Sequence, residues 1–104
     1  MFRGILTTIY VDLKKGVPAD KQNFVLKNNN KKKIFVKIAK RGTLLSTNDV
    51  INTNNCIISV CKSKNKNKLI ILSVIDNLIK GGSGQAVQNM NILYNFNENE
   101  GLSD

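Results

Sequence analysis

The sequence contains no histidine and no tryptophan, and it has only one proline and two cysteines among 104 residues. Histidine is the commonest general base near neutral pH and the commonest metal ligand. Its absence excludes a Ser-His-Asp triad, a Cys-His dyad and a histidine-containing metal site built from these residues, and we expect no metal. Two cysteines cannot form a disulfide framework, which favours a reducing, cytoplasmic compartment.

Long apolar runs are missing as well. No stretch reaches the roughly 18 consecutive apolar residues of a membrane span, and the first residues do not resemble a secretory signal. We therefore expect no membrane partner. The length suits a single domain at most.

Negative charge is scarce, because 16 Lys and Arg residues face 7 Asp and Glu residues and give a net charge of +9. Such a charge is typical of nucleic-acid-binding proteins. However, Lys (14), Asn (16) and Ile (12) are all frequent, and a genome rich in A and T would raise all three together. The lysine runs at 31–33 and 62–68 contain no aromatic residue that could stack on a base. We interpret these runs as solvated loops and keep a small basic nucleic-acid-binding module as the alternative function.

Alternating β-branched and apolar residues predict four strands, over residues 5–13, 34–38, 56–61 and 69–75. The first is partly apolar on both faces, which favours an interior position in the sheet. The Lys- and Asn-rich stretch between the last two is typical of a hairpin loop.

Two helices are expected around these strands. The first begins near Pro18 and is short, because the asparagines at 28–30 favour a loop. Residues 44–55 have no clear period and predict an irregular loop. Glycines break the chain at 81–84, and a second helix then follows over residues 85–94. Its apolar residues recur at helical spacing: Ala86, Val87, Met90, Leu93 and Tyr94.

This order of elements predicts an α+β fold, with a partial mixed or antiparallel sheet and a C-terminal helix. We expect one partial domain over residues 1–94, followed by a polar tail at 95–104 that frays.

Cys56 and Cys61 lie five residues apart on one predicted strand. An odd spacing places them on opposite faces, so they are not expected to pair or to share a metal. Each is interpreted as a small buried apolar residue rather than a nucleophile.

The segment from Asp76 to Gln85 leads from a buried strand through a glycine-rich turn into a helix. Glycines allow backbone N–H groups to approach a ligand, and a helix N-terminus favours negative charge. Asn77 can both donate and accept hydrogen bonds. Turns of this kind also occur for steric reasons alone, and the spacing is not that of a P-loop.

The same region, VIDNLIKGGSGQAVQNMN at 74–91, closely resembles the C-terminal signature of N-acetyl-gamma-glutamyl-phosphate reductases. RGILTTIYV at 3–11 is similar to a segment early in the second domain of that family. Ser46-Thr47, Val50 and Asn54 with Cys56 match weaker motifs between them, in the same order.

This resemblance implies an NADP-dependent reduction of N-acetyl-γ-glutamyl phosphate to the semialdehyde, in arginine biosynthesis. The family uses a cysteine nucleophile, a histidine acid/base, a Rossmann-type domain and a second domain like that of glyceraldehyde-phosphate dehydrogenase, which also builds a homo-oligomer. The nucleophile and the histidine lie upstream of the matched segments. The resemblance therefore implies a fragment without its Rossmann domain, inactive alone, with no catalytic residue of its own. Its partner would be the missing N-terminal portion, if that is encoded separately.

The resemblance also implies roles for residues of the 76–85 segment. Asn77, Gly81, Gly82 and Gln85 are expected near the cofactor, NADP. Lys80 and Arg3 are expected near the anionic substrate, although Arg3 fits a surface ion pair equally well.

Overall fold

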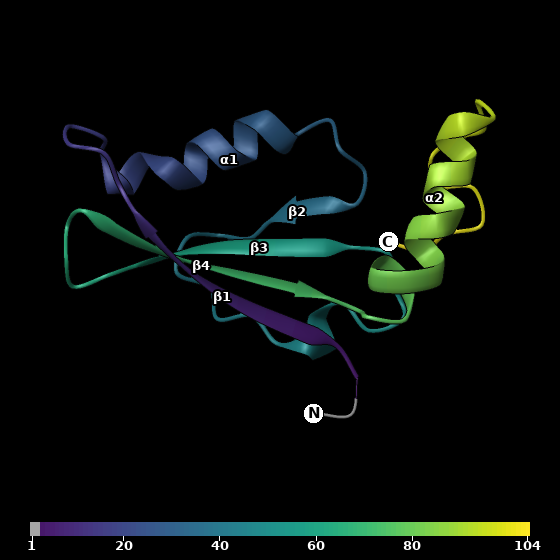
Figure 1. The fold of residues 1–104 in the computed structure, drawn as a ribbon, viewed down its shortest axis with the longest axis horizontal. Coiled ribbons are helices and arrows are strands. Elements are labelled where there is room, and N and C mark those ends of the chain that lie inside the picture. Colours follow the sequence, from purple (N-terminus) through teal and green to yellow (C-terminus); the bar gives the residue numbers. More distant parts are fainter. Residues whose placement is uncertain (1–2) are drawn as a thin grey trace.

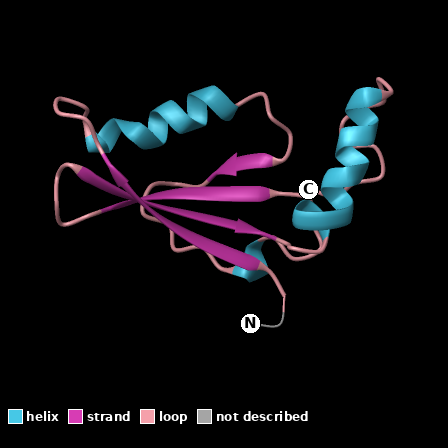
Figure 2. Ribbon diagram, viewed as in Figure 1, coloured by secondary structure: helices cyan, strands magenta, loops and turns pink. Residues whose placement is uncertain are grey.

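The computed structural model describes residues 3–104 and shows one four-stranded mixed sheet with helices around it (Figure 1). The strands are β1 (Ile5–Asp12), β2 (Val36–Ile38), β3 (Cys56–Lys62) and β4 (Lys68–Ile75), in the spatial order β1-β4-β3-β2. The longer helices are α1 (Gln22–Asn30) and α2 (Gly84–Leu93). Short turns of helix are η1 (Ala19–Lys21), η2 (Thr47–Asp49) and η3 (Ile79–Ser83). The predicted α+β class is confirmed (Figure 2).

β1 lies at an edge of the sheet, so the interior position expected from its two apolar faces is wrong. In the described part of the chain it pairs only with β4, in an antiparallel register that places Ile5 opposite Ile75 and Asp12 opposite Lys68. Ile5, Leu6 and Ile9 are 42–45 % exposed, and Tyr10 is 77 % exposed. The apolar residues on the two faces of β1 are therefore largely left exposed to solvent by this chain.

β3 and β4 form the antiparallel hairpin that the sequence predicts, with Cys56 opposite Ile75 and Lys62 opposite Leu69. β2 pairs with β3 in parallel, from Val36 opposite Cys56 to Ile38 opposite Ile58. A parallel pair needs a crossover connection. Here it is the segment 39–55, which is irregular apart from η2.

α1 runs alongside β2 at the side of the molecule away from β1 (Figure 1). It continues through Asn30, so the loop expected at the three asparagines is wrong. Asn30 stays in the helix by donating its side-chain amide to the carbonyl of Leu26, 2.8 Å away. β2 is shorter than expected, because the ladder with β3 begins only at Val36.

The apolar core is small and lies around the central strands. Val60, Leu69 and Val74 of β3 and β4 are buried, together with Phe35 and Val50 from the segments beside them. The shortest dimension of the Cα trace is 18 Å against 43 Å for the longest. Two sheets packed face to face are already about 10 Å apart. A molecule only 18 Å across its shortest dimension therefore has little room for a deep apolar core.

α2 stands at the end of the sheet and buries its polar side (Figure 1). Its buried residues are Gly84, Gln88 and Asn91, whereas Met90 and Leu93 of the predicted apolar stripe are 45 % and 73 % exposed. The helix itself is confirmed, and the assumption that its apolar stripe packs inside this chain is wrong.

The tail after α2 folds back on the molecule, so the expected fraying is not observed. Asn91 donates its side-chain amide to the carbonyl oxygens of Glu98 and Glu100, each at 3.0 Å. The backbone N–H of Asn54 donates to the carbonyl of Ser103 at 2.7 Å. Across residues 3–104, no helix is long and apolar enough to span a membrane.

Candidate functional site

A buried carboxylate organises the end of β4. Asp76 is fully buried, and its two oxygens accept hydrogen bonds from Arg3, from the N–H of Asn52 (2.8 Å) and from the N–H of Leu78 (2.9 Å). The Arg3 guanidinium approaches through Nε at 3.0 Å and Nη2 at 2.7 Å. Burial acts to raise the pKa of Asp76, but these hydrogen bonds and the charge of Arg3 outweigh it and hold the pKa below its usual value.

Asn77 is held by the segment before β1. Its Oδ1 accepts a hydrogen bond of 2.8 Å from the N–H of Gly4. Gly4 has a φ of +105°, and a Cβ there would lie 2.6 Å from the Cβ of Thr47, so a side chain at this position would be strained and would collide. Arg3-Gly4 and Asp76-Asn77, 73 residues apart, thus form two parallel contacts.

The glycine-rich turn continues directly from this pair. The N–H of Gly81 donates to the carbonyl of Asp76 at 3.1 Å. A Cβ on Gly82 would lie 3.2 Å from the carbonyl oxygen of Asn77. Gly81 and Gly82 are both exposed, so their backbone is open to a molecule outside the chain. The turn is wound as the wide helical turn η3, with Gly82 departing from helical geometry (φ −149°, ψ −114°).

Gly84 allows α2 to pack closely against this turn. A Cβ there would lie 2.6 Å from the carbonyl oxygen of Ile79 and would collide with Oδ1 of Asn54. The residue is buried, so neither neighbour has open space to move into. Gly84 is therefore required for the packing of α2, and this requirement is independent of any ligand bound at Gly81 and Gly82.

Lys80 points away from the Arg3–Asn77 group. Its Nζ donates to Oε1 of Gln88 at 2.7 Å and lies 5.5 Å from the ring centroid of Phe35. It borders a recess of about 340 Å³ that also includes Lys33 and Glu98. Burial lowers the pKa of Lys80, while the nearby Cys56 and Glu98 act in the opposite direction.

The structure thus brings together Arg3, Asn77, Gly81 and Gly82, whereas the side chain of Lys80 is hydrogen-bonded to Gln88 and that of Gln85 to Asn89. Gln85 lies on α2 and donates to Oδ1 of Asn89, one turn later, at 2.8 Å.

A buried amide network, which the sequence pattern did not predict, joins α2 to the rest of the chain. Gln88 accepts from both Lys80 and Asn54 at its Oε1 and donates from Nε2 to Oε2 of Glu98 at 2.9 Å. Gly84 and the polar residues Gln88 and Asn91 share the 3.6-residue period of a helix face. This spacing was visible in the sequence, but the polar face of an amphipathic helix is normally expected to face solvent.

The cysteines lie on β3 and both are half-buried, free thiols. The Sγ of Cys56 lies 3.5 Å from Oγ of Ser73 on the neighbouring strand. Within residues 3–104 there is no cluster of three or more His, Cys, Asp or Glu side chains that could hold a metal ion.

Residues 1–77 match the family described as "Semialdehyde dehydrogenase, dimerisation domain". The chain belongs to this family. Proteins named N-acetyl-gamma-glutamyl-phosphate reductase from Thermoanaerobacter sp. (strain X514), Pelobacter propionicus and Vesicomyosocius okutanii are 45 %, 46 % and 48 % identical to it over 98–99 % of its length. The chain spans only 28–30 % of the length of these relatives. The predicted resemblance to part of such a reductase is confirmed, and the nucleic-acid alternative is not favoured.

Solved structures show the same fold at low sequence identity. Aspartate semialdehyde dehydrogenase II from Vibrio cholerae is 18 % identical and superposes with a TM-score of 0.68. A structure of that enzyme complexed with ASA is 17 % identical and has a TM-score of 0.66. In both, this chain covers 28 % of the larger protein. The small core is therefore consistent with a part of a larger family fold.

Proposed function

We propose that this chain forms the C-terminal part of an NADPH-dependent N-acetyl-gamma-glutamyl-phosphate reductase, acting in the cytoplasm in arginine biosynthesis. The observation that carries the proposal is the 45–48 % identity to proteins of that name over nearly the whole chain. The ordered turn at the end of β4 is the part of the chain that would face the cofactor.

The geometry of that turn supports contact with a nicotinamide cofactor. Gly4 holds the Oδ1 of Asn77, which orients the amide and leaves its Nδ2 as the donor toward a ligand. The exposed backbone at Gly81 and Gly82 has no side chain that would keep a planar ring away. When bound, NADPH would supply the hydride. Gln85 is proposed to flank the same ring from the first turn of α2.

Lys80 and Arg3 are proposed to place the negative charge of the substrate. Lys80 is a partly buried cation beside a recess that is open to solvent. Arg3 already donates to Asp76. It would therefore aid substrate binding in two ways, through its positive charge and by holding Gly4 and Asn77 in position.

We further propose that the chain requires the remainder of a reductase for turnover. It has no histidine, which the family uses as acid/base. Its β1 and the outer side of α2 expose large apolar residues, as expected of surfaces that pack against other domains or subunits.

A domain graft tests this proposal. The matching C-terminal segment of the Thermoanaerobacter sp. reductase is replaced by this chain, and NADPH oxidation with N-acetyl-γ-glutamyl phosphate is measured. We expect the graft to be active and the isolated chain to be inactive. Asn77→Ala in the graft should raise the KM for NADPH and lower kcat by about tenfold or more, since a lost ligand contact costs about 1–3 kcal/mol.

Asn28→Ala, an exposed change on α1, is the matched control and should leave both constants unchanged. A folded graft that is oligomeric but inactive would contradict the proposed function, as would turnover by the isolated chain.

A further inference from the structure

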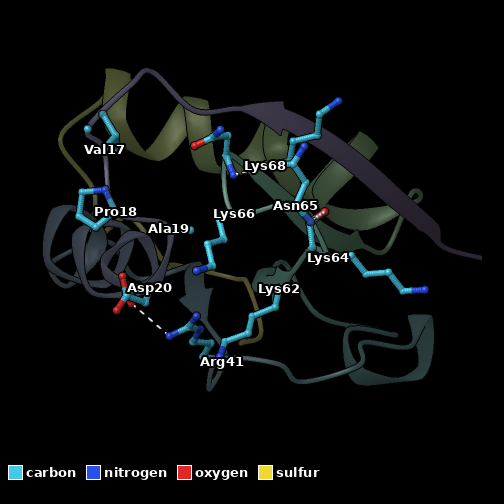
Figure 3. Close-up of a pocket in the computed structure, with 13 residues that line it drawn as sticks. Val17, Pro18, Ala19, Asp20, Arg41, Lys62, Lys64, Asn65, Lys66 and Lys68 are labelled. Atoms are coloured by element: carbon cyan, nitrogen blue, oxygen red, sulfur yellow. Dashed lines mark hydrogen bonds between the residues drawn. The ribbon is translucent and has the colours of Figure 1, made fainter.

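A recess larger than the one beside Lys80 lies at the opposite end of the sheet from the Asp76–Gln85 turn. It has a volume of about 670 Å³, within the range of small-ligand sites. Its walls come from three separate segments: the turn at 16–20, Arg41 after β2, and the β3–β4 hairpin at 62–68. Figure 3 shows these segments surrounding one open space.

Cations from two of the three segments converge on this space. In Figure 3 the side chains of Lys62 and Lys66 extend toward Arg41 and the 16–20 turn, whereas Lys64 points away. Arg41 is half-buried and donates from Nη1 to the carbonyl oxygen of Asp20 at 3.3 Å, which ties two walls together. Of the residues that the structure describes, Asp20 is the only acidic one that lines the recess. Lys68 also lines the recess but pairs with Asp12 at 3.4 Å, so the cations that remain for its centre are Arg41, Lys62 and Lys66.

We propose that this recess binds a small oligophosphate, that is, two or more linked phosphate groups. Three cations around one cavity match a ligand with several negative charges better than a single phosphate, because each charge-assisted contact adds to the same site. Among residues 3–104 no aromatic side chain lines the recess, so these residues offer no platform on which a base could stack. This favours recognition of the phosphate groups over recognition of a single-stranded nucleic acid.

The arrangement also distinguishes this site from a basic loop that owes its lysines to composition alone. Such a loop would place its cations at random with respect to the rest of the chain. Here Arg41, 21 residues from the hairpin in sequence, lies opposite Lys62 and Lys66 and is fixed by its contact with Asp20. A specific site therefore predicts that Arg41, Lys62 and Lys66 matter and that equally charged lysines elsewhere do not.

Isothermal titration of the full chain with tripolyphosphate, orthophosphate and a 12-mer of single-stranded DNA, each at about 0.05 M and 0.15 M salt, tests this proposal. The test variant is Lys62→Gln with Lys66→Gln. The control, Lys27→Gln with Lys31→Gln, removes the same charge from the last turn of α1 and the residue that follows it, neither of which lines the recess. Arg41→Gln and Arg41→Lys examine the remaining cation, and thermal melting verifies that every variant is folded.

We expect tripolyphosphate to bind more tightly than orthophosphate and to weaken with salt. The test variant should lose about tenfold in affinity, since two charge contacts are removed, and the control less than twofold. Arg41→Gln should weaken binding more than Arg41→Lys. Equal losses in test and control variants, no binding by the folded wild-type chain, or tighter binding of the DNA than of tripolyphosphate through the same residues would overturn the proposal.

Discussion

Asp76 is the residue on which the geometry of the candidate cofactor turn depends most directly. It is a buried charge, and such a group is stable only when it is paired and hydrogen-bonded. Its partners come from three places in the sequence, at Arg3, Asn52 and Leu78. The carboxylate therefore joins the start of β1, the crossover loop and the glycine-rich turn at one point.

Removing one partner of this pair should destabilise the fold strongly. For Arg3→Ala we expect a loss of about 3 kcal/mol in the free energy of unfolding, because Asp76 would be left as an unpaired buried charge. Arg3 is itself a quarter exposed, which places the expected loss at the lower end for such pairs. Urea denaturation at pH 7 measures it. Arg41→Ala, at the opposite end of the sheet, should cost less than half as much.

The low pKa of Asp76 predicts how stability depends on pH. The carboxyl binds a proton more readily in the unfolded chain than in the folded one, so its contribution is complete above about pH 5. It is lost as the pH falls through the ordinary aspartate pKa and then through the lowered folded value. We expect Asp76→Asn to be less stable than wild type at pH 7 and to show a flatter dependence between pH 5 and about pH 3.

Asp12→Asn is the matched control for this pH dependence, because the side chain of Asp12 is 84 % exposed. Its unfolding free energy should follow the wild-type curve. If Asp76→Asn retained the full wild-type slope, the pH-dependent stability would have to come from other carboxyl groups.

At the scale of the element, α2 shows that an amphipathic pattern does not specify which face is buried. Its polar face packs onto the Asn54 side chain and the 95–104 segment, and its apolar face is exposed. Burying amides is favourable only if their hydrogen bonds are made, and Asn91 makes two to the carbonyls of the tail.

Because α2 buries its polar face, a substitution on that face should affect stability more than one on its apolar face. Asn91→Leu should destabilise the isolated chain by about 1–3 kcal/mol, because the carbonyls of Glu98 and Glu100 lose their donor. Leu93→Asn, on the exposed face, should change stability by less than about 0.5 kcal/mol. Thermal and urea unfolding of the two variants provide the comparison. The opposite order would show that the apolar face is the buried one.

The turn into α2 makes a further prediction. Gly84→Ala should destabilise the chain by about 1–3 kcal/mol, the usual cost of forcing atoms into a filled space. In an exposed helix the same change would be stabilising, since alanine is the better helix former. Unfolding of Gly84→Ala beside Asn89→Ala separates packing from helix propensity, and a stabilised Gly84→Ala variant would rule out the close contact with Asn54 and Ile79.

At the scale of the whole molecule, the sheet has an uncovered edge and little thickness. β1 presents unpaired backbone groups on one side and exposed Ile5, Leu6, Ile9 and Tyr10 around it. Edges of this kind favour association with another chain. The family that the chain matches is described as a dimerisation domain, which supports the proposal that this exposed edge pairs with another copy of the chain.

We therefore expect the purified chain to self-associate in a concentration-dependent manner. Sedimentation velocity over a hundredfold concentration range should show the weight-average mass rising above the 11.6 kDa of one chain. Leu6→Lys with Tyr10→Lys should shift the equilibrium toward monomer, because charge at an edge strand opposes pairing. Phe24→Lys with Val25→Lys, which removes exposed apolar area from α1, is the control. A monomer at every concentration would contradict the expectation.

Local patterns were sufficient for the parts of the structure that depend on neighbouring residues. The alternation of apolar residues placed all four strands, and the glycine-rich turn into α2 was recognised from its spacing. The resemblance of 74–91 to a reductase signature identified the family. These features depend on backbone geometry and side-chain period, which act over a few residues.

Long-range packing decided the rest. Whether β1 is interior or at an edge depends on how many strands pair with it, and its own composition is the same in either case. The buried face of α2 was decided by amide donors meeting carbonyls of the tail, and the direction of Lys80 by Gln88 and Phe35. Such partners lie far away in the sequence or in adjacent helical turns, and only the folded chain brings their atoms within hydrogen-bonding distance.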